Sequence, residues 1–237
     1  MTRILSWNIL HGGGSRIPDI LDVIASHEPD IVTLQEMRRG KGEAALRAGL
    51  EHIGLTDIYI PDTNEARENT ILVAARTSFE AQRWPDDTGR TPDDNGLCHG
   101  VYARFDAFEI ISLHFPQKKA QIPLFHALLD LPTDEARLLI GDMNCGIPFE
   151  DSDTKTFQNT HLFQQLLMRG WTDAWRSRNP DAREFSWISA KRRNGFRYDH
   201  ALATAGFDQR VETALYDHNP REAGISDHSL LMLNLAS

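Results

Sequence analysis

Cysteine is scarce in this chain of 237 residues, and the two that occur, Cys98 and Cys145, are far apart. They form no Cys-x-x-Cys pair, so neither a disulfide framework nor a zinc knuckle is indicated. Ten histidines are present, but the zinc-peptidase motif HExxH is missing, because His27-Glu28 is followed by Pro29. The lipase-type elbow GxSxG is absent, and the glycines after His11 lack the Lys-Ser/Thr of a P-loop.

Long apolar stretches are also missing. No run approaches the roughly 20 apolar residues that a bilayer span requires. The opening residues MTRILSWNIL lead directly into strand-like sequence, without the pattern of a secretory signal. We therefore expect a cytoplasmic protein without membrane insertion. The net charge of −9 disfavours tight, sequence-independent coating of nucleic acid, but it allows an enzyme with a local basic face.

The composition that remains is that of a folded protein, with 41% hydrophobic and 25% charged residues. The length fits one large α/β domain, which we expect to span residues 1–237. Strand patterns occur at 4–9, 30–36, 71–75, 100–104, 108–113, 138–140, 198–203, 210–216 and 230–235. Helical patterns occur at 17–25, 43–52, 124–131 and 160–168. This interleaving predicts an α/β fold, with an exposed loop at 85–95.

Polar side chains that can bind a metal or move a proton recur where these apolar strands begin or end. They are Asn8, Glu36, His114, Asp142, Asn144, Asp199, Asp227 and His228. In layered α/β proteins, strand ends hold functional side chains on a rigid backbone. Each residue alone is more typical of a turn or a cap. It is their grouping into short motifs in a fixed order that indicates a function.

Five motifs make up that order, namely WN (7–8), LQE (34–36), GDMN (141–144), YDHAL (198–202) and SDH (226–228). The set resembles the endonuclease/exonuclease/phosphatase superfamily. This superfamily includes exonuclease III-type abasic-site endonucleases, pancreatic-type deoxyribonucleases, neutral sphingomyelinases and inositol polyphosphate 5-phosphatases. The resemblance spans nearly the whole chain. It implies a four-layer α/β sandwich, in which two packed mixed β-sheets are flanked by helices and the active site opens at one end.

The resemblance also implies roles for single residues. Glu36 is expected to be the main ligand of a divalent metal, usually Mg²⁺, with Mn²⁺ as a substitute. Asn8 is expected to support metal and phosphate binding, and Asp227 to help bind a metal. Such an assignment agrees with chemistry, because a hard cation held by oxygen ligands neutralises the charge that builds up on a phosphoester during cleavage.

The remaining roles concern the phosphate and the proton. Asp142 and Asn144 resemble the pair that positions the attacking water or leaving oxygen. His228 is expected on the scissile phosphate or as a general base, oriented by Asp199, since a His–Asp pair fixes the tautomer and stabilises the imidazolium. His114 is expected to contact the phosphate as a further donor.

Two basic clusters stand out against the acidic total. One directly follows Glu36 and the other precedes Asp199. Such clusters are often only solvated surface, but these two adjoin predicted catalytic residues. Basic groups combined with aromatic rings suit an anionic substrate with a stackable part. The residues predicted to bind substrate are Arg38, Arg39, Lys191, Arg192, Arg193, Trp187 and Phe196.

The sequence departs from the abasic-site endonucleases at one informative position. His114 stands where those enzymes usually have Tyr, and it is closer to the deoxyribonuclease and phosphodiesterase branches. The leading interpretation is a divalent-metal-dependent phosphoester hydrolase, a nuclease that cleaves DNA or RNA. The alternative is a phosphodiesterase or phosphatase acting on a nucleotide, lipid head group or sugar phosphate. A non-catalytic binding relative is disfavoured, because every placed position holds a competent residue. No obligate protein partner is implied.

Overall fold

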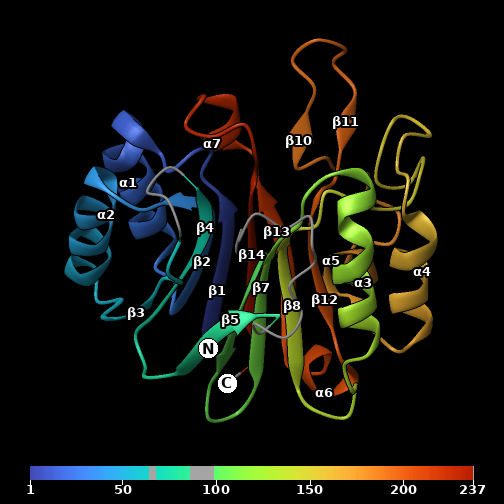
Figure 1. Ribbon diagram of the computed structural model, residues 1–237, viewed down its shortest axis with the longest axis horizontal. Helices are drawn as coiled ribbons and strands as arrows, with labels where there is room; N and C mark the ends of the chain where they lie inside the picture. The colour runs from blue at the N-terminus through green and yellow to red at the C-terminus, as the bar shows by residue number, and fades with distance from the viewer. Residues whose placement is uncertain (64–67, 86–98, 237) are drawn as a thin grey trace.

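The computed structural model describes residues 1–63, 68–85 and 99–236 of the chain. Two β-sheets pack face to face, and helices cover both outer sides (Figure 1). This arrangement confirms the predicted α/β sandwich of two packed mixed sheets flanked by helices. In the described residues, no helix has the length and apolar character needed to cross a bilayer.

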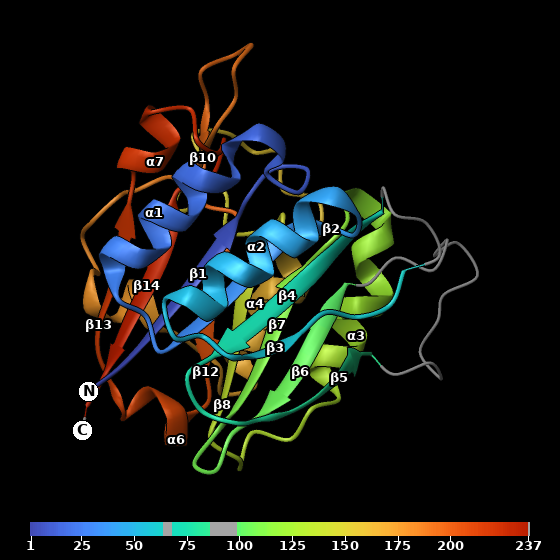
Figure 2. The same cartoon turned by 90° about the vertical axis from the view of Figure 1, so that its left-hand side faces the viewer.

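The first sheet has six strands in the order β13-β14-β1-β2-β4-β3. Their bounds are Val211–Asp217, Leu230–Leu235, Thr2–Asn8, Ile31–Arg38, Asn69–Ala75 and Asp57–Tyr59. β1 pairs in parallel with β2 and antiparallel with β14, so the sheet is mixed. Helices α1 (Ile17–His27) and α2 (Lys41–His52) lie across its outer face (Figure 2).

The second sheet has the order β5-β6-β7-β8-β12-β9. Its strands are Glu80–Trp84, Gly100–Arg104, Glu109–His114, Arg137–Asp142, Asp199–Ala203 and Thr172–Asp173. β7 and β8 are parallel, whereas β12 runs antiparallel to β8. Helices α3 (Ile122–Leu129) and α4 (Thr160–Met168) cover its outer side (Figure 1).

Three apolar layers hold the sandwich together. Between the sheets, Ile4 and Val73 of the first sheet belong to one buried cluster with Ile110 and Leu138 of the second. The outer faces of both sheets are buried as well, under the helices. Strands that are buried on both faces read as continuous apolar runs rather than alternating ones. This is why β1 and β8 could be recognised from the sequence.

Strand direction brings the candidate residues to one edge of the sandwich. The carboxyl ends of the parallel pairs β1–β2 and β7–β8 hold Asn8 and Asp142, and β12 starts at that edge because it is antiparallel to β8. Gly141 is required in β8, since its φ is +134° and a Cβ there would lie 2.1 Å from the carbonyl oxygen of Leu113. This close approach fixes Asp142 at the end of the strand.

The elements that the sequence did not reveal are the short ones. These are β3, β5, β9, η1 (Gly14–Arg16), η3 (Lys118–Gln121), α5 (Ala174–Arg178), α6 (Ala205–Asp208), α7 (Asn219–Glu222) and the hairpin of β10 (Trp187–Ile188) and β11 (Gly195–Phe196). Segments this short lack a full hydrophobic period. The predicted loop at 85–95 lies, except for Pro85, outside the described residues.

Candidate active site

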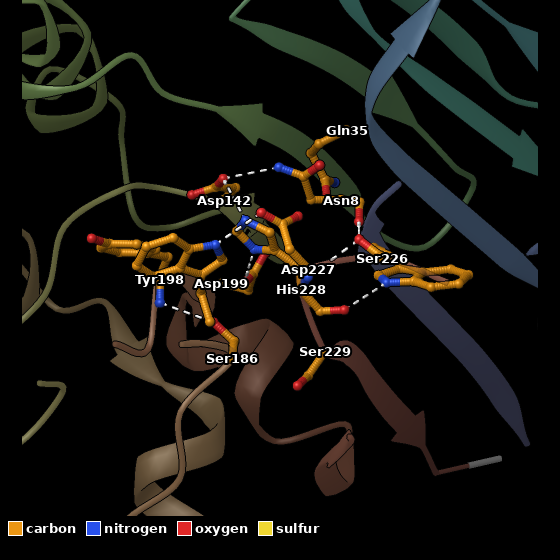
Figure 3. A network of polar contacts seen from close by, with 12 residues as sticks. Asn8, Gln35, Asp142, Ser186, Tyr198, Asp199, Ser226, Asp227, His228 and Ser229 are labelled. Carbon is orange, nitrogen blue, oxygen red and sulfur yellow. Dashed lines mark hydrogen bonds and ion pairs between the residues drawn. The ribbon is translucent and has the colours of Figure 1, made fainter. Parts of the chain in front are cut away.

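Side chains from both sheets converge at this edge, as Figure 3 shows for Asn8, Asp142, Asp199, Asp227 and His228. Asn8 lies at the centre of the group. Its Nδ2 is 3.3 Å from Glu36 Oε1 and 3.1 Å from Asp142 Oδ2, so one amide donates to carboxylates from both sheets. Its Oδ1 accepts the backbone N–H of Leu10, which fixes the orientation of the amide.

Glu36 is held in an uncommon backbone conformation. Its φ is +57°, and the pairing of β2 with β4 shifts register between Leu34 and Met37. A left-handed residue at such an irregularity is strained and re-aims its side chain. Burial would raise the pKa of Glu36, but His114 and the backbone N–H of His11, 2.8 Å from Oε2, hold it below its usual value. The carboxylate is therefore charged at neutral pH.

His228 forms a buried pair with Asp199, with Nδ1 2.8 Å from Asp199 Oδ2. Burial alone would lower the pKa of His228, but Asp199, and then Asp142, raise it to about 10. The pKa of Asp199 is held below its usual value by His228 despite burial. The pair therefore carries a fixed imidazolium at neutral pH, oriented by a carboxylate.

Asp142 faces the other nitrogen of His228, with Oδ2 3.8 Å from Nε2. Its Oδ1 accepts the backbone N–H of Asn144 at 2.9 Å. Burial raises the pKa of Asp142 to about 7, although the attraction of His228 opposes the shift. A carboxyl group with this pKa can accept or release a proton near neutral pH.

His114 and Asn144 complete the side of the site that belongs to the second sheet. His114 Nε2 lies 3.8 Å from Glu36 Oε1. Burial lowers the pKa of His114 to about 4, which keeps its imidazole neutral. Asn144 has a φ of +46° and donates its Nδ2 to the carbonyl oxygen of Phe115. Both are neutral groups beside the charged ones.

An aromatic cluster adjoins the catalytic candidates on the side of the β10–β11 hairpin. Phe196 stacks on Tyr198 at 5.1 Å, and Trp187 lies 5.8 Å from Phe196 and 5.6 Å from Tyr198. The indole N–H of Trp187 donates to Asp227 Oδ2 at 2.9 Å. The predicted residues Trp187 and Phe196 therefore lie together, and Trp187 contacts Asp227 directly.

The predicted basic residues divide into three groups. Lys191, Arg192 and Arg193 are exposed at the tip of the hairpin, which projects beyond the ends of the sheets (Figure 1). Arg38 contacts His11 at the rim. Arg39 is turned away, because its guanidinium pairs with Glu43 and Asp62. Its role in substrate binding stays a prediction.

Several residues that support the site were not predicted. Ser186 Oγ accepts the backbone N–H groups of Tyr198 and Asp199, at 3.0 and 3.2 Å. Ser226 Oγ donates to the carbonyl oxygen of Asn8 at 2.6 Å, and the indole of Trp7 donates to the carbonyl oxygen of His228. Ser226 and Trp7 were visible as members of the SDH and WN motifs. Nothing in the sequence indicated their partners, because each contact joins distant segments.

The donor set fits a divalent cation. Two carboxylates, from Glu36 and Asp142, share the amide of Asn8. Oxygens that neutralise a hard cation are typically carboxylates of this kind. In the described part of the chain, Asp199 Oδ1 and Asp227 Oδ1 are buried without a hydrogen-bond partner. Ligand atoms of Asp142, Asp199 and His228 also lie within 4.8 Å of one another. The ionised carboxylate of Glu36 and these unpaired oxygens are the groups that a cation would neutralise.

Solved structures with this fold are similar over their full length. An AP endonuclease from Archaeoglobus fulgidus has a TM-score of 0.83 and 20% identity, with 100% of both chains covered. A variant of the 3′ phosphatase NExo from Neisseria, bound to a product DNA hairpin, has a TM-score of 0.82 and 19% identity, again with 100% of both chains covered. The 3′-5′ exonuclease NExo from Neisseria meningitidis has a TM-score of 0.80 and 20% identity, with the same coverage.

A comparison with curated protein sequences finds no match. The profile described as Endonuclease/Exonuclease/phosphatase family, in contrast, matches residues 5–228. This range includes every motif from which the resemblance was drawn. The chain therefore belongs to the endonuclease/exonuclease/phosphatase family.

Proposed function

We propose that this protein is a divalent-metal-dependent phosphoester hydrolase that acts on DNA. The observation that carries the proposal is a convergence of side chains from both sheets. Glu36, Asn8 and His228, which directly precedes β14, come from the first sheet, and Asp142 and Asp199 come from the second. A paired imidazolium, an ionised carboxylate and a carboxyl group of pKa about 7 then face one space. Such a set serves attack by water on a phosphate.

The proposed metal is Mg²⁺, held chiefly by Glu36, with Asp227 contributing an oxygen. When bound, it supplies positive charge that neutralises the phosphate and stabilises the leaving oxygen. Asn8 donates to both carboxylates and keeps them aimed at the same space. His114 and Asn144 offer neutral donors to the phosphate oxygens.

The proton transfer is proposed for Asp142. Its carboxylate accepts a proton from the attacking water, since its pKa of about 7 matches the working pH. His228, which is charged, binds a non-bridging phosphate oxygen, and Asp199 keeps its ring in place. This division differs from a general-base role for His228, because an imidazolium of pKa about 10 has no free lone pair at neutral pH.

The choice of DNA as substrate rests on the surroundings of the site. The exposed cations at the hairpin tip suit a polyanion, and the aromatic cluster suits a sugar or a base. The solved relatives include an AP endonuclease and a 3′ phosphatase bound to a DNA hairpin. A small phosphate ester would make no use of the projecting cations.

The test is an activity panel on 5′-labelled DNA duplexes that end in a 3′-hydroxyl, end in a 3′-phosphate or contain an abasic site. RNA, plasmid and bis-p-nitrophenyl phosphate complete the panel, each with Mg²⁺, with Mn²⁺ and with EDTA. We expect metal-dependent cleavage of at least one DNA substrate. Glu36→Gln should lower the rate by at least ~100-fold, while Glu43→Gln on α2 retains it. Cleavage confined to bis-p-nitrophenyl phosphate, or equal rates in EDTA, would contradict the proposal.

A further inference from the structure

A cavity of about 600 Å³ lies between the β10–β11 hairpin and α7, directly beside the candidate active site. Ser226 and Asp227, which precede His228, form part of its wall. The hairpin and α7 both lie at the end of the sandwich that carries the site (Figure 1). The volume is within the range of pockets that enclose one small ligand, and no step of the proposed reaction uses it.

The two walls of this cavity are fastened to each other. Arg221, in α7, donates its Nη1 to the carbonyl oxygen of Phe185 at 2.9 Å, just before the hairpin begins. Trp187 ties the hairpin to the catalytic segment, because its backbone bridges to His228 and its indole donates to Asp227. The cavity is therefore preformed, as pockets for specific ligands usually are.

The lining combines aliphatic side chains with two arginines. Leu10 and Ile188 supply apolar surface, and Ile188 is 36% exposed. Arg193 is exposed, and within the described residues its guanidinium makes no hydrogen bond or ion pair. Arg221 uses one of its donors on the backbone, and its Nη2 lies 4.0 Å from Glu222. Guanidinium donors beside apolar surface fit a nucleotide, whose phosphate accepts the donors and whose base covers the aliphatic groups.

Two acids also line the cavity, and neither opposes the phosphate of a nucleotide strongly. Asp227 Oδ2 accepts the indole N–H of Trp187, and the other oxygen is the one proposed to bind the metal. The side chain of Glu222 is 68% exposed, so water and salt screen its charge. Arg193 and Arg221 thus keep donors for an anionic ligand.

The position and size of the cavity determine which nucleotide can enter it. Successive nucleotides of a DNA strand rise by about 3.4 Å, so the nucleotide next to the scissile phosphate is within reach of a cavity that shares Asp227 with the site. A paired base is covered by its partner strand and by the bases above and below it, so it cannot enter a pocket enclosed between two elements. A mismatched or single-stranded base is already free to leave the stack.

We propose that this cavity binds an unpaired nucleotide next to the scissile phosphate, and that the enzyme prefers DNA in which this nucleotide lacks a Watson–Crick partner. Arg193 and Arg221 contact the phosphate on the far side of that nucleotide, and Leu10 and Ile188 contact its base. The inference rests on the proposed function, since it assumes that DNA is the substrate. It adds the state of the DNA that the site selects, namely a mismatch, a frayed end or an overhang.

The test uses the DNA duplex that the unaltered protein cleaves best, with the cleavage position mapped on a sequencing gel. Derived duplexes each carry one mismatch at a nucleotide that adjoins the scissile phosphate. We expect one such mismatch to raise kcat/KM about tenfold over the fully paired duplex. Ala190→Trp, which fills the cavity from an exposed position of the hairpin, should reduce this ratio to less than about twofold. Arg193→Asn, which suits the backbone φ of +59°, should reduce the ratio about threefold.

The matched control is Ala45→Trp, at an exposed position of α2, which should keep the tenfold ratio. If DNA is cleaved but paired and mismatched duplexes react equally, or if the preference survives in Ala190→Trp, the inference is overturned and the proposed function stands. Loss of the preference in Ala45→Trp as well would also count against the cavity. If no DNA in the panel is cleaved, the proposed function itself fails.

Discussion

The charge on His228 depends on its immediate neighbours. Replacing it by Ala, or replacing Asp199 by Asn, removes the imidazolium or its carboxylate partner. We expect turnover to fall by at least ~100-fold, as loss of a positioned donor that stabilises the transition state does. Steady-state cleavage of a labelled duplex measures the effect. The matched control is His27→Ala, which removes a His–carboxylate pair with Asp217 outside the site and should keep full turnover.

When no metal is bound, the ionised carboxylate of Asp142 lowers the free energy of unfolding of the protein. Because its pKa is raised from 3.8 to about 7, the folded protein retains a proton that the unfolded chain releases over that interval. Stability therefore falls as pH rises from about 4 to 7 and stays reduced above it. In EDTA at pH 8, Asp142→Asn should increase the free energy of unfolding by ~1–2 kcal/mol, while activity assayed with Mg²⁺ should be lost. Urea denaturation at pH 4 and pH 8 measures the difference, and a gain of equal size at both values would contradict this account.

Residue types in motifs could be predicted from the sequence, and their contacts could not. Glu36, Asp142 and His228 were predicted as site residues because each belongs to an ordered motif next to a strand. The contact of His11 with Glu36 could not be predicted, because it depends on two left-handed backbone conformations. The pairing of Arg39 with Glu43 and Asp62 could not be predicted either, because a basic residue beside a motif gives no sign of its partners.

At the scale of elements, the β10–β11 hairpin is expected to contribute to DNA binding independently of the catalytic candidates. Its tip places Arg192 and Arg193 in solvent, where they can contact phosphates beyond the scissile one. The double variant Arg192→Gln/Arg193→Gln should weaken DNA binding and reduce the slope of log affinity against log salt by roughly 1–2. Fluorescence anisotropy at several salt concentrations measures both quantities.

The comparison variant is Arg210→Gln, which is exposed just after α6, at the opposite end of the sheets (Figure 1). It changes net charge without touching the hairpin, so its salt slope should match that of the unaltered protein. An unchanged slope in the hairpin variant would show that Arg192 and Arg193 do not contact DNA phosphates.

Long elements were predictable and short ones were not. The buried strands β1, β2, β7 and β8 appear as continuous apolar runs, and α1 shows helical spacing. The hairpin was missed because each of its strands has two residues and no periodicity. Its position depends on tertiary contacts, such as the bridge between Trp187 and His228.

At the scale of the whole molecule, a buried ion network supports the second sheet. Arg197 is 1% exposed, and its guanidinium contacts Asp151 and Asp173, at 2.6 Å each. The ring of Trp175 lies 4.9 Å from the guanidinium carbon. Arg197→Met should lower the free energy of unfolding by about 3–5 kcal/mol, because two carboxylates lose a buried partner.

Chemical denaturation monitored by tryptophan fluorescence tests this value. The control is Arg183→Met, which breaks a half-exposed pair with Asp153 and should cost no more than about 1 kcal/mol. Similar losses in both variants would mean that the buried network adds nothing specific to stability. The network was not predicted, because the sequence does not show which charged residues lie inside.

The division of the site between two sheets has a consequence for synthesis of the protein. Asn8 and Glu36 leave the ribosome before Asp199 and His228, which follow 163 to 220 positions later and arrive from β12 and the segment before β14. A growing polypeptide thus holds no complete hydrolytic centre until translation has passed His228. The proposed nuclease would thereby stay inactive while it is being made, and truncated products of interrupted translation would lack the candidate site.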